Sequence, residues 1–363
     1  MPSVVIIGAG LVGAATALAL HQAGIQSTLY DQAQPTEPVM DGYPVEFGET
    51  GGSVVIQASG LRVLKALGVL EECFEAGRRC SYISWHKIDG SSPLVSDTST
   101  SNRTAGETDP SLLRPLQILR SKLHRILIHA CHKAGIATQT GKKLVGVTEN
   151  ESSVTATFAD GSTATGDLLI GADGIHSATR RQIFGENCTA TFVGSTGYIG
   201  VVNIKEHGID LKETEELAFY TDRDNKRVVT AFKVDAKRVP RVLLVGDAAH
   251  GMVPNAGLCL MVGLEDVGTL RALFQRLPDA KQWQRVLELY STLRVPRCTK
   301  TANQARSFRI SNTASASTFG GDLNHFIFGL VVYAANAGYF SSYTVFDCEG
   351  EVEKLFVEKE NEN

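Results

Sequence analysis

The segment Val4–Gly13 reads VVIIGAGLVG, and it decides how the first part of this chain folds. Four consecutive β-branched residues are typical of a parallel strand that is buried on both faces. Three glycines follow with the spacing G-x-G-x-x-G. The alanine- and leucine-rich residues 14–23 predict a helix that ends at Gly24, and residues 25–30 predict a second strand with Asp31 at its end. The sequence therefore predicts a complete strand–helix–strand unit with a glycine turn inside it.

Each glycine of this turn has a separate task in a nucleotide-binding unit. Gly8 permits the tight turn, Gly10 lets the backbone approach a pyrophosphate, and Gly13 lets the helix pack closely on the strand. The helix N-terminus then presents unpaired N–H groups and a positive dipole to the phosphates. Asp31 is expected to accept hydrogen bonds from ribose hydroxyls. The alternative is a tight turn without a ligand, and this motif alone does not separate FAD from NAD.

Two more glycine-marked segments follow short apolar runs later in the chain. Residues 171–174 read GADG after the run 168–170, and residues 246–250 read GDAAH after the run 242–245. Three such turns in this order indicate one nucleotide that is held from three sides. We interpret that nucleotide as FAD.

Length and composition exclude several classes of protein. The chain has 363 residues, of which 43% are hydrophobic, so it can bury a sizeable core. Its net charge of -4, without a dense Lys/Arg stripe, gives no support to a nucleic-acid partner. The seven cysteines are scattered without a C-x-x-C pair, which argues against a disulfide framework and against structural zinc. A reduced, cytoplasmic setting fits this pattern best.

Membrane and export signals are weak. The chain enters its first core strand directly after three residues, so we expect no signal peptide. The apolar stretch 326–340 is short for a membrane span. We expect a packed helix there, with shallow membrane contact as the alternative.

The two later segments resemble known motifs over more than their glycines. Residues 168–180 resemble the Asp-Gly motif of flavoprotein hydroxylases, and residues 241–250 resemble their Gly-Asp motif. With the first motif, they make the chain resemble the FAD-dependent monooxygenases of the p-hydroxybenzoate and salicylate hydroxylase family (group A flavoproteins). Residues 51–68, 119–123 and 290–297 resemble further stretches of that family.

The resemblance implies an α/β fold in three parts. It comprises a Rossmann-like FAD-binding domain of the glutathione-reductase type, a reduced mixed-sheet substrate domain and C-terminal helices. We predict the FAD-binding parts at 1–75, 116–185 and 241–310, the substrate-side segments at 76–115 and 186–240, and a C-terminal helical tail at 311–363. From Glu349 onward the charged tail is expected to fray.

The resemblance also assigns roles to single residues. Asp247 would accept hydrogen bonds from the ribityl chain of FAD, with a helix N-cap as the alternative. Asp173 and Gly174 would contact both the flavin and the incoming nicotinamide, with a plain turn as the alternative. Arg120 would lie near the flavin or its phosphates, with a solvated arginine as the alternative. His250 is interpreted as a packing residue. The predicted cofactor-binding set is Gly8, Gly10, Gly13, Asp31, Gly52, Ser53, Arg120, Asp173, Gly174, Asp247, Gly257 and Leu260.

No metal site or side-chain nucleophile is predicted. His124, His129 and His132 share one amphipathic helix, but carboxylates in ligand spacing do not accompany them. The implied activity is NAD(P)H-dependent hydroxylation or epoxidation of a small aromatic, polyketide-like or terpenoid-like molecule, which points to secondary metabolism. A reduced nicotinamide would pass hydride to FAD, and O2 would then supply one oxygen atom to the substrate. The protein would orient the cofactor and exclude water. The oligomeric state stays open.

Three departures from the family pattern concern the substrate side. Asp173 and Gly246 are only 73 positions apart, so much of the substrate-side sheet is missing. An open pocket, a pocket closed by a partner, a different construction and an incomplete gene model or splice form all fit this gap. The strand 198–203 carries Val202 where an arginine is usual, and a frequent Tyr-Pro pair is lost. Cys259 replaces a second glycine and would either crowd the flavin or point away from it. A non-oxygenating cyclase or isomerase and a catalytically impaired binding protein therefore remain alternatives.

Overall fold

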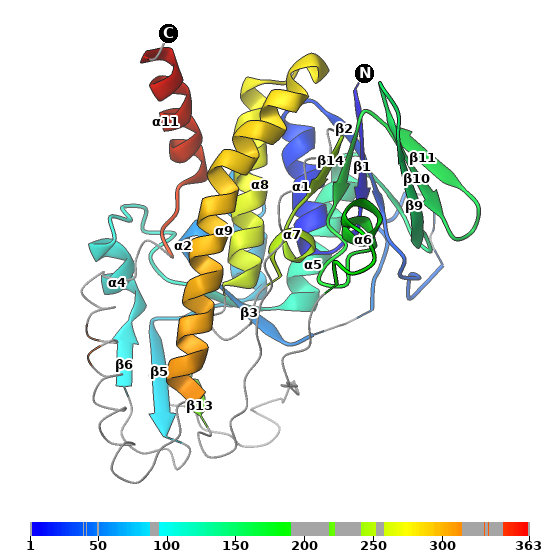
Figure 1. Ribbon diagram of the computed structural model, residues 1–363. Coiled ribbons are helices and arrows are strands. Elements are labelled where there is room, and N and C mark those ends of the chain that lie inside the picture. Colours follow the sequence, from blue (N-terminus) through cyan, green and yellow to red (C-terminus); the bar gives the residue numbers. More distant parts are fainter. Residues whose placement is uncertain are drawn as a thin grey trace.

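The computed structural model describes residues 2–38, 40, 42–48, 51–87, 94–189, 218–221, 241–251, 258–313, 330, 333 and 344–361. At its centre lies a parallel sheet with the strand order β14-β12-β1-β2-β8 (Figure 1). Its strands are β1 (Ser3–Ile7), β2 (Gln26–Tyr30), β8 (Ala137–Gln139), β12 (Leu168–Gly171) and β14 (Val242–Leu244). Because β14, β12 and β1 are parallel neighbours, the glycine turns that follow them meet at one carboxyl edge of the sheet. Open α/β sheets bind their ligands at such edges.

The alternating side chains of β1 serve two different cores. Val4 and Ile6 belong to the large core on the side of the helices, whereas Val5 and Ile7 belong to a smaller core on the opposite face. This arrangement confirms the prediction of a strand buried on both faces. On the helical side, α1 (Leu11–Gln22) packs against both α5 (Arg120–Lys133) and α8 (Cys259–Arg276).

An antiparallel sheet covers the smaller core. It consists of β9 (Leu144–Glu149), β10 (Val154–Phe158) and β11 (Thr163–Gly166) in the order β11-β10-β9. Phe158 is 2% exposed and packs in this core. The sequence of residues 144–147 and of residues 154–158 predicts a strand at each place, and both strands are present.

A second small sheet and a long helix lie outside the parallel sheet. A three-stranded sheet in the order β3-β7-β4 directly precedes α5, because β7 ends at Leu119 and α5 begins at Arg120. The long α9 runs beside α8 (Figure 1). The bounds of these elements are β3 (Ser53–Ile56), α2 (Ala58–Ala66), α3 (Leu70–Ala76), β4 (Arg78–Arg79), β7 (Leu116–Leu119), α6 (Ala178–Phe184), α7 (Asp247–His250), η3 (Ala280–Gln282) and α9 (Trp283–Thr313).

A small mixed sheet lies on the predicted substrate side. β5 (Tyr82–Lys87) pairs antiparallel with β6 (Leu94–Asp97) and parallel with β13 (Ala218–Thr221). Figure 1 shows this sheet far from the β9–β11 sheet. The two predicted substrate-side segments, 76–115 and 186–240, therefore share one sheet. The predicted strand 198–203 with Val202 lies outside the described residues.

Residues 90–111 are rich in Ser, Thr, Gly and Asp, which predicts a flexible surface loop, but the described part of this segment is ordered. It contains β6 and α4 (Thr98–Thr104). The side chain of Asp97 caps α4 by accepting hydrogen bonds from the N–H groups of Ser99 and Thr100. Asn102 is buried and donates to the Leu113 carbonyl at 2.8 Å. The polar composition thus reflects capping and buried hydrogen bonds rather than disorder.

The expectation that the tail frays from Glu349 is wrong. The tail forms α11 (Cys348–Asn361), which packs against α8. Val352 is fully buried in the large core, with Leu355 and Phe356 packed beside it. Its acidic residues pair with arginines of α8, as in the ion pair between Glu349 and Arg271. The prediction failed because the many charged residues of this segment belong to an amphipathic helix.

The packing of α11 yields a prediction about stability. Val352→Ala should lower the free energy of unfolding by about 2 kcal/mol, since it removes buried methyl groups and leaves a cavity. Val357 lies on the same helix but is 47% exposed, so Val357→Ala should change the free energy by less than about 0.5 kcal/mol. Both substitutions change helix propensity equally. Urea denaturation of the two variants measures the difference, and equal losses would show that α11 does not dock.

The residues 326–340 lie largely outside the described part of the chain, in which only Leu330 and Tyr333 are placed. Within the described residues, no helix combines the length and apolarity that a membrane crossing requires.

Candidate cofactor-binding site

In the glycine turn after β1, the fold leaves no room for a side chain at Gly8 and Gly13 but does leave room at Gly10. Gly8 has a φ of +101°, and a Cβ there would lie 2.5 Å from the Ala172 carbonyl oxygen. A Cβ on Gly13 would lie 1.9 Å from the Gly8 carbonyl oxygen. A Cβ on Gly10 would meet no atom of the described residues within 4 Å. Gly10 thus faces open space at the start of α1, which is the arrangement that a bound pyrophosphate needs.

Ala9, between these glycines, is held from both sides. Its N–H donates to Oδ2 of Asp31 at 2.7 Å, and its carbonyl accepts from Nε2 of His124 at 2.6 Å. The other oxygen of Asp31 accepts from the N–H of Ala33 at 2.8 Å. Burial is the largest influence on His124 and lowers the pKa of its imidazole. Sequence reasoning considered His124 only as a metal ligand and missed this contact, because spacing along α5 carries no signal for it.

A cleft opens beside the turn. Gly10, the loop 45–48 and the first turns of α5 line it, including Arg120 and Lys122. Arg125 also lines the cleft, but it pairs with Glu46 there at 3.2 Å. The exposed Arg120 forms no ion pair with any described residue, and its backbone N–H donates to the Gly52 carbonyl at 2.9 Å. Cationic side chains beside an open helix N-terminus favour an anionic ligand. The cleft therefore suits the phosphates of a nucleotide.

The second glycine turn uses its carboxylate internally. Asp173 accepts hydrogen bonds from the Ser177 hydroxyl at 2.5 Å, and from the Thr179 N–H and hydroxyl at 2.9 and 3.0 Å. These bonds tie the turn to the start of α6. Gly174 has a φ of +74°, and a Cβ there would meet no described atom within 4 Å. The backbone around Gly174, rather than the Asp173 side chain, is therefore what this turn offers to a ligand.

Arg180 joins the second turn to the third. Its buried guanidinium donates to the Ile175 carbonyl at 2.6 Å, to the Ala248 carbonyl at 2.8 Å and to the Cys188 carbonyl at 3.0 Å. Ile175 follows the second turn, and Ala248 belongs to α7 after the third. The predicted site did not include Arg180, although it ends the motif at 168–180. The available signal was an arginine at the end of a segment that resembles a family motif.

The third turn presents the carboxylate of Asp247. Asp247 is the first residue of α7, and its side chain accepts no hydrogen bond from the described residues. The helix cap is Gly246 without a side-chain bond, so the N-cap alternative for Asp247 does not hold. Burial raises the pKa of Asp247, and the charges of His250 and Arg120 oppose that rise. Asp247 is half-buried, and hydroxyl groups of a ligand are suitable donors to its carboxylate.

The remaining predicted residues lie around this centre. Gly52 is buried, and Ser53 is exposed at the start of β3. Leu260 is half-buried in the first turn of α8 and packs against the large core, while Gly257 lies outside the described residues. Cys259 packs against a small apolar cluster formed by Leu258, Val262 and Cys298.

These features fit FAD. The open glycine, the Arg120 and Lys122 side chains of the cleft and the Asp247 carboxylate come from different segments, and they match the phosphates and hydroxyls of one dinucleotide. In the described part of the chain, His250, Asp266 and Cys298 have the spacing of possible metal ligands. However, Asp266 already accepts three hydrogen bonds there, one of them from Arg294.

Known proteins share this architecture. A family model described as an FAD binding domain matches residues 1–238 and 205–305. The FAD-dependent urate hydroxylase of Mycolicibacterium vanbaalenii is 33% identical over 203 residues, which is 55% of this chain and 47% of that protein. The putative FAD-dependent monooxygenase YetM of Bacillus subtilis is 28% identical and covers 84% of this chain and 92% of its own length. The solved structure of a salicylate hydroxylase with its substrate superposes with a TM-score of 0.69 at 20% identity, covering 97% of each chain.

Proposed function

Because the chain belongs to the FAD-binding domain family, as a group A FAD-dependent monooxygenase, we propose that it transfers one oxygen atom from O2 to a small aromatic molecule with NAD(P)H as electron donor. The observation that supports this most is the meeting of three glycine turns at the carboxyl edge of β14, β12 and β1. The relatives named for urate and salicylate hydroxylation support an aromatic substrate.

The proposal gives each turn a part in holding FAD. Gly8, Gly10 and Gly13 admit the pyrophosphate to the N-terminus of α1, with Arg120 beside it. Asp31 keeps an acceptor free for the ribose, since each of its oxygens accepts only one hydrogen bond from the described residues. Asp247 accepts from the ribityl hydroxyls. The backbone of Asp173 and Gly174, together with Gly52, Ser53, Gly257 and Leu260, completes the set.

The protein's own contribution is to bind, orient and exclude water. FAD, when bound, supplies the chemistry of accepting hydride and activating O2. Exclusion of water protects reactive species from decay, and placement of the substrate carbon next to the cofactor lowers the barrier to transfer. The mixed sheet of β5, β6 and β13 is the wall on which we place the substrate. Since no disulfide joins any of the seven cysteines, all of which lie in the described part of the chain, we also place the protein in the cytoplasm.

One observation favours a second candidate. The interval between Asp173 and Gly246 is only 73 positions, so the substrate wall is small. A wide or open pocket admits water and suits a non-oxygenating cyclase or isomerase better than an oxygenase.

Turnover tests the proposed function. The protein is loaded with FAD and mixed with NADH or NADPH and one member of a panel of uric acid, salicylate, hydroxybenzoates and phenols. We expect at least one compound to accelerate NAD(P)H oxidation several-fold and to yield a hydroxylated product. If flavin binds but no compound stimulates oxidation, the second candidate gains support.

A further inference from the structure

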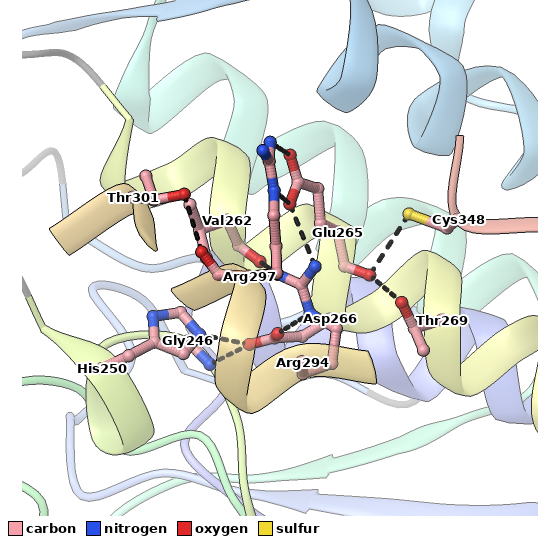
Figure 2. A network of polar contacts seen from close by, with 10 residues as sticks. All are labelled: Gly246, His250, Val262, Glu265, Asp266, Thr269, Arg294, Arg297, Thr301 and Cys348. Carbon is pink, nitrogen blue, oxygen red and sulfur yellow. Dashed lines mark hydrogen bonds and ion pairs between the residues drawn. The ribbon is translucent and has the colours of Figure 1, made fainter. Parts of the chain in front are cut away.

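Five charged side chains form a buried network beneath the third glycine turn (Figure 2). They come from α7, α8 and α9, and Figure 2 shows them converging between these helices. Glu265 and Asp266 are completely buried, and the side chain of His250 is 10% exposed. Arg294 and Arg297 are 2% and 8% exposed. Buried charges are costly unless each has partners, so this network must be closely specified.

The two adjacent carboxylates of α8, Glu265 and Asp266, have different partners in this network. Glu265 accepts from Arg294 at 3.0 Å and from Arg297 at 2.7 and 2.9 Å, so its side chain faces only α9. Asp266 accepts from Nε of Arg294 at 2.7 Å with one oxygen. Its other oxygen turns toward the glycine turn. Here it accepts from the N–H of Gly246 at 2.9 Å and from Nε2 of His250 at 2.5 Å.

The contact between Asp266 and His250 is an ion pair. Burial alone lowers the pKa of His250, but the charge of Asp266, with a smaller part from Cys298, outweighs burial and raises the pKa well above its usual value. For Asp266, burial acts in the opposite direction and raises the pKa. The charges of His250 and Arg294 outweigh burial and lower the pKa of Asp266, so its carboxyl group stays ionised. Besides Arg294, Tyr290 and Cys298 are titratable groups of α9 that lie beside Asp266.

These contacts of Asp266 fix the position of Asp247. It lies between Gly246 and His250, and Asp266 binds both of those residues. A bond from a backbone N–H to a charged acceptor is stronger than a neutral one. Asp266 thus fixes both ends of α7, which is only four residues long, and with them the direction of the Asp247 carboxylate.

We propose that Asp266 is a positioning residue for FAD, which holds the Gly246–Asp247 turn in the form that receives the cofactor. The inference rests on the proposed role of Asp247 in binding FAD. Asp266 itself lies behind the turn and reaches the cofactor only through it. Preorganisation of this kind lowers the cost of ordering the site when the ligand binds.

Two neighbouring buried carboxylates provide a matched test. Asp266→Asn and Glu265→Gln each neutralise one completely buried charge and weaken the hydrogen bond that this residue accepts from Arg294. Both substitutions should therefore lower the melting temperature. The FAD dissociation constant is measured by quenching of flavin fluorescence, at a temperature where circular dichroism shows every variant to be folded. We expect Asp266→Asn to bind FAD about tenfold more weakly, whereas Glu265→Gln binds as tightly as the unaltered protein. Equal effects of the two variants, or no effect of Asp266→Asn, would overturn the proposal.

A second pair keeps the test informative if Asp266→Asn does not fold. His250→Leu removes the donor to Asp266, and His250→Gln retains a side-chain N–H. We expect His250→Leu to lose affinity for FAD and His250→Gln to recover part of it; identical losses would contradict positioning through this contact. Asp247→Ala separates the two claims. If it binds FAD normally, the proposed role of Asp247 is wrong; if it loses affinity while Asp266→Asn does not, only the positioning role is wrong.

Discussion

Gly10→Ala should leave the protein folded and yet weaken FAD binding by about a hundredfold, which corresponds to about 2.7 kcal/mol. Gly10 has a φ of -69°, which alanine adopts without strain. Its Cβ would point into space that contains no described atom within 4 Å, so the apoprotein has nothing to displace. That space is where the pyrophosphate must approach the backbone. A methyl group there therefore penalises only the complex. Flavin fluorescence quenching measures the affinity, and thermal denaturation without FAD measures the fold.

Two other glycines serve as controls for this prediction. Gly8→Ala combines a φ of +101° with a contact of 2.5 Å to a backbone carbonyl, so the apoprotein itself should be destabilised. Gly146, in β9, would place its Cβ at an ordinary 3.6 Å from Thr157, and Gly146→Ala should change neither stability nor affinity appreciably. If Gly10→Ala bound FAD as well as Gly146→Ala does, the phosphate site would lie elsewhere.

Arg180→Met should lower the free energy of unfolding by about 3–5 kcal/mol and weaken FAD binding as well. The substitution leaves the carbonyl groups of Ile175, Ala248 and Cys188 without their buried donor, and each unpaired buried acceptor costs about 1–3 kcal/mol. It also cuts the link between the second and third glycine turns, which must act together on one ligand. Urea denaturation of the apoprotein gives the first quantity, and fluorescence quenching gives the second.

The next residue offers a matched control. Arg181 donates to the His176 carbonyl at 2.7 Å, but its side chain is 31% exposed and its ion pair with Glu186 spans 3.7 Å. Arg181→Met should therefore cost no more than about 1 kcal/mol and leave FAD affinity unchanged. Similar losses in the two variants would mean that Arg180 does not join the turns.

The sequence predicts those parts of the site that depend on local backbone geometry. The run Val4–Gly13 contains its own strand, turn and helix start, and the structure confirms each of them. The short apolar runs before Gly171 and Gly246 form the neighbouring strands β12 and β14. Local patterns suffice here because a parallel strand followed by a glycine turn needs no distant partner to be recognised.

Contacts between distant residues were not predictable in this way. His124 and Arg180 bind backbone carbonyl groups, which every residue carries, so no pattern of side chains marks their partners. The pairing of Asp266 with His250 spans 16 positions and depends on how α7 meets α8. The acidic tail was misjudged for a related reason, because its glutamates pair with arginines of α8, which lie far away in the sequence.

The substrate side is the part on which the proposed activity depends most. The described residues there form a sheet of only three strands, β13, β5 and β6. The substrate wall has to hold an aromatic ring close to the cofactor and keep water out if oxygen is to reach the ring. A test of the proposed activity therefore has to measure oxygen transfer, because cofactor binding alone does not establish it.

The most direct measurement follows the oxygen atom itself. The FAD-loaded protein is incubated with NAD(P)H and the compound that most accelerates NAD(P)H oxidation, under an atmosphere of ¹⁸O2, and the product is analysed by mass spectrometry. We predict a hydroxylated product that carries one ¹⁸O atom for each NAD(P)H oxidised. A product that lacks ¹⁸O, or NAD(P)H oxidation that yields only hydrogen peroxide with every compound of the panel, would contradict the assignment of monooxygenation.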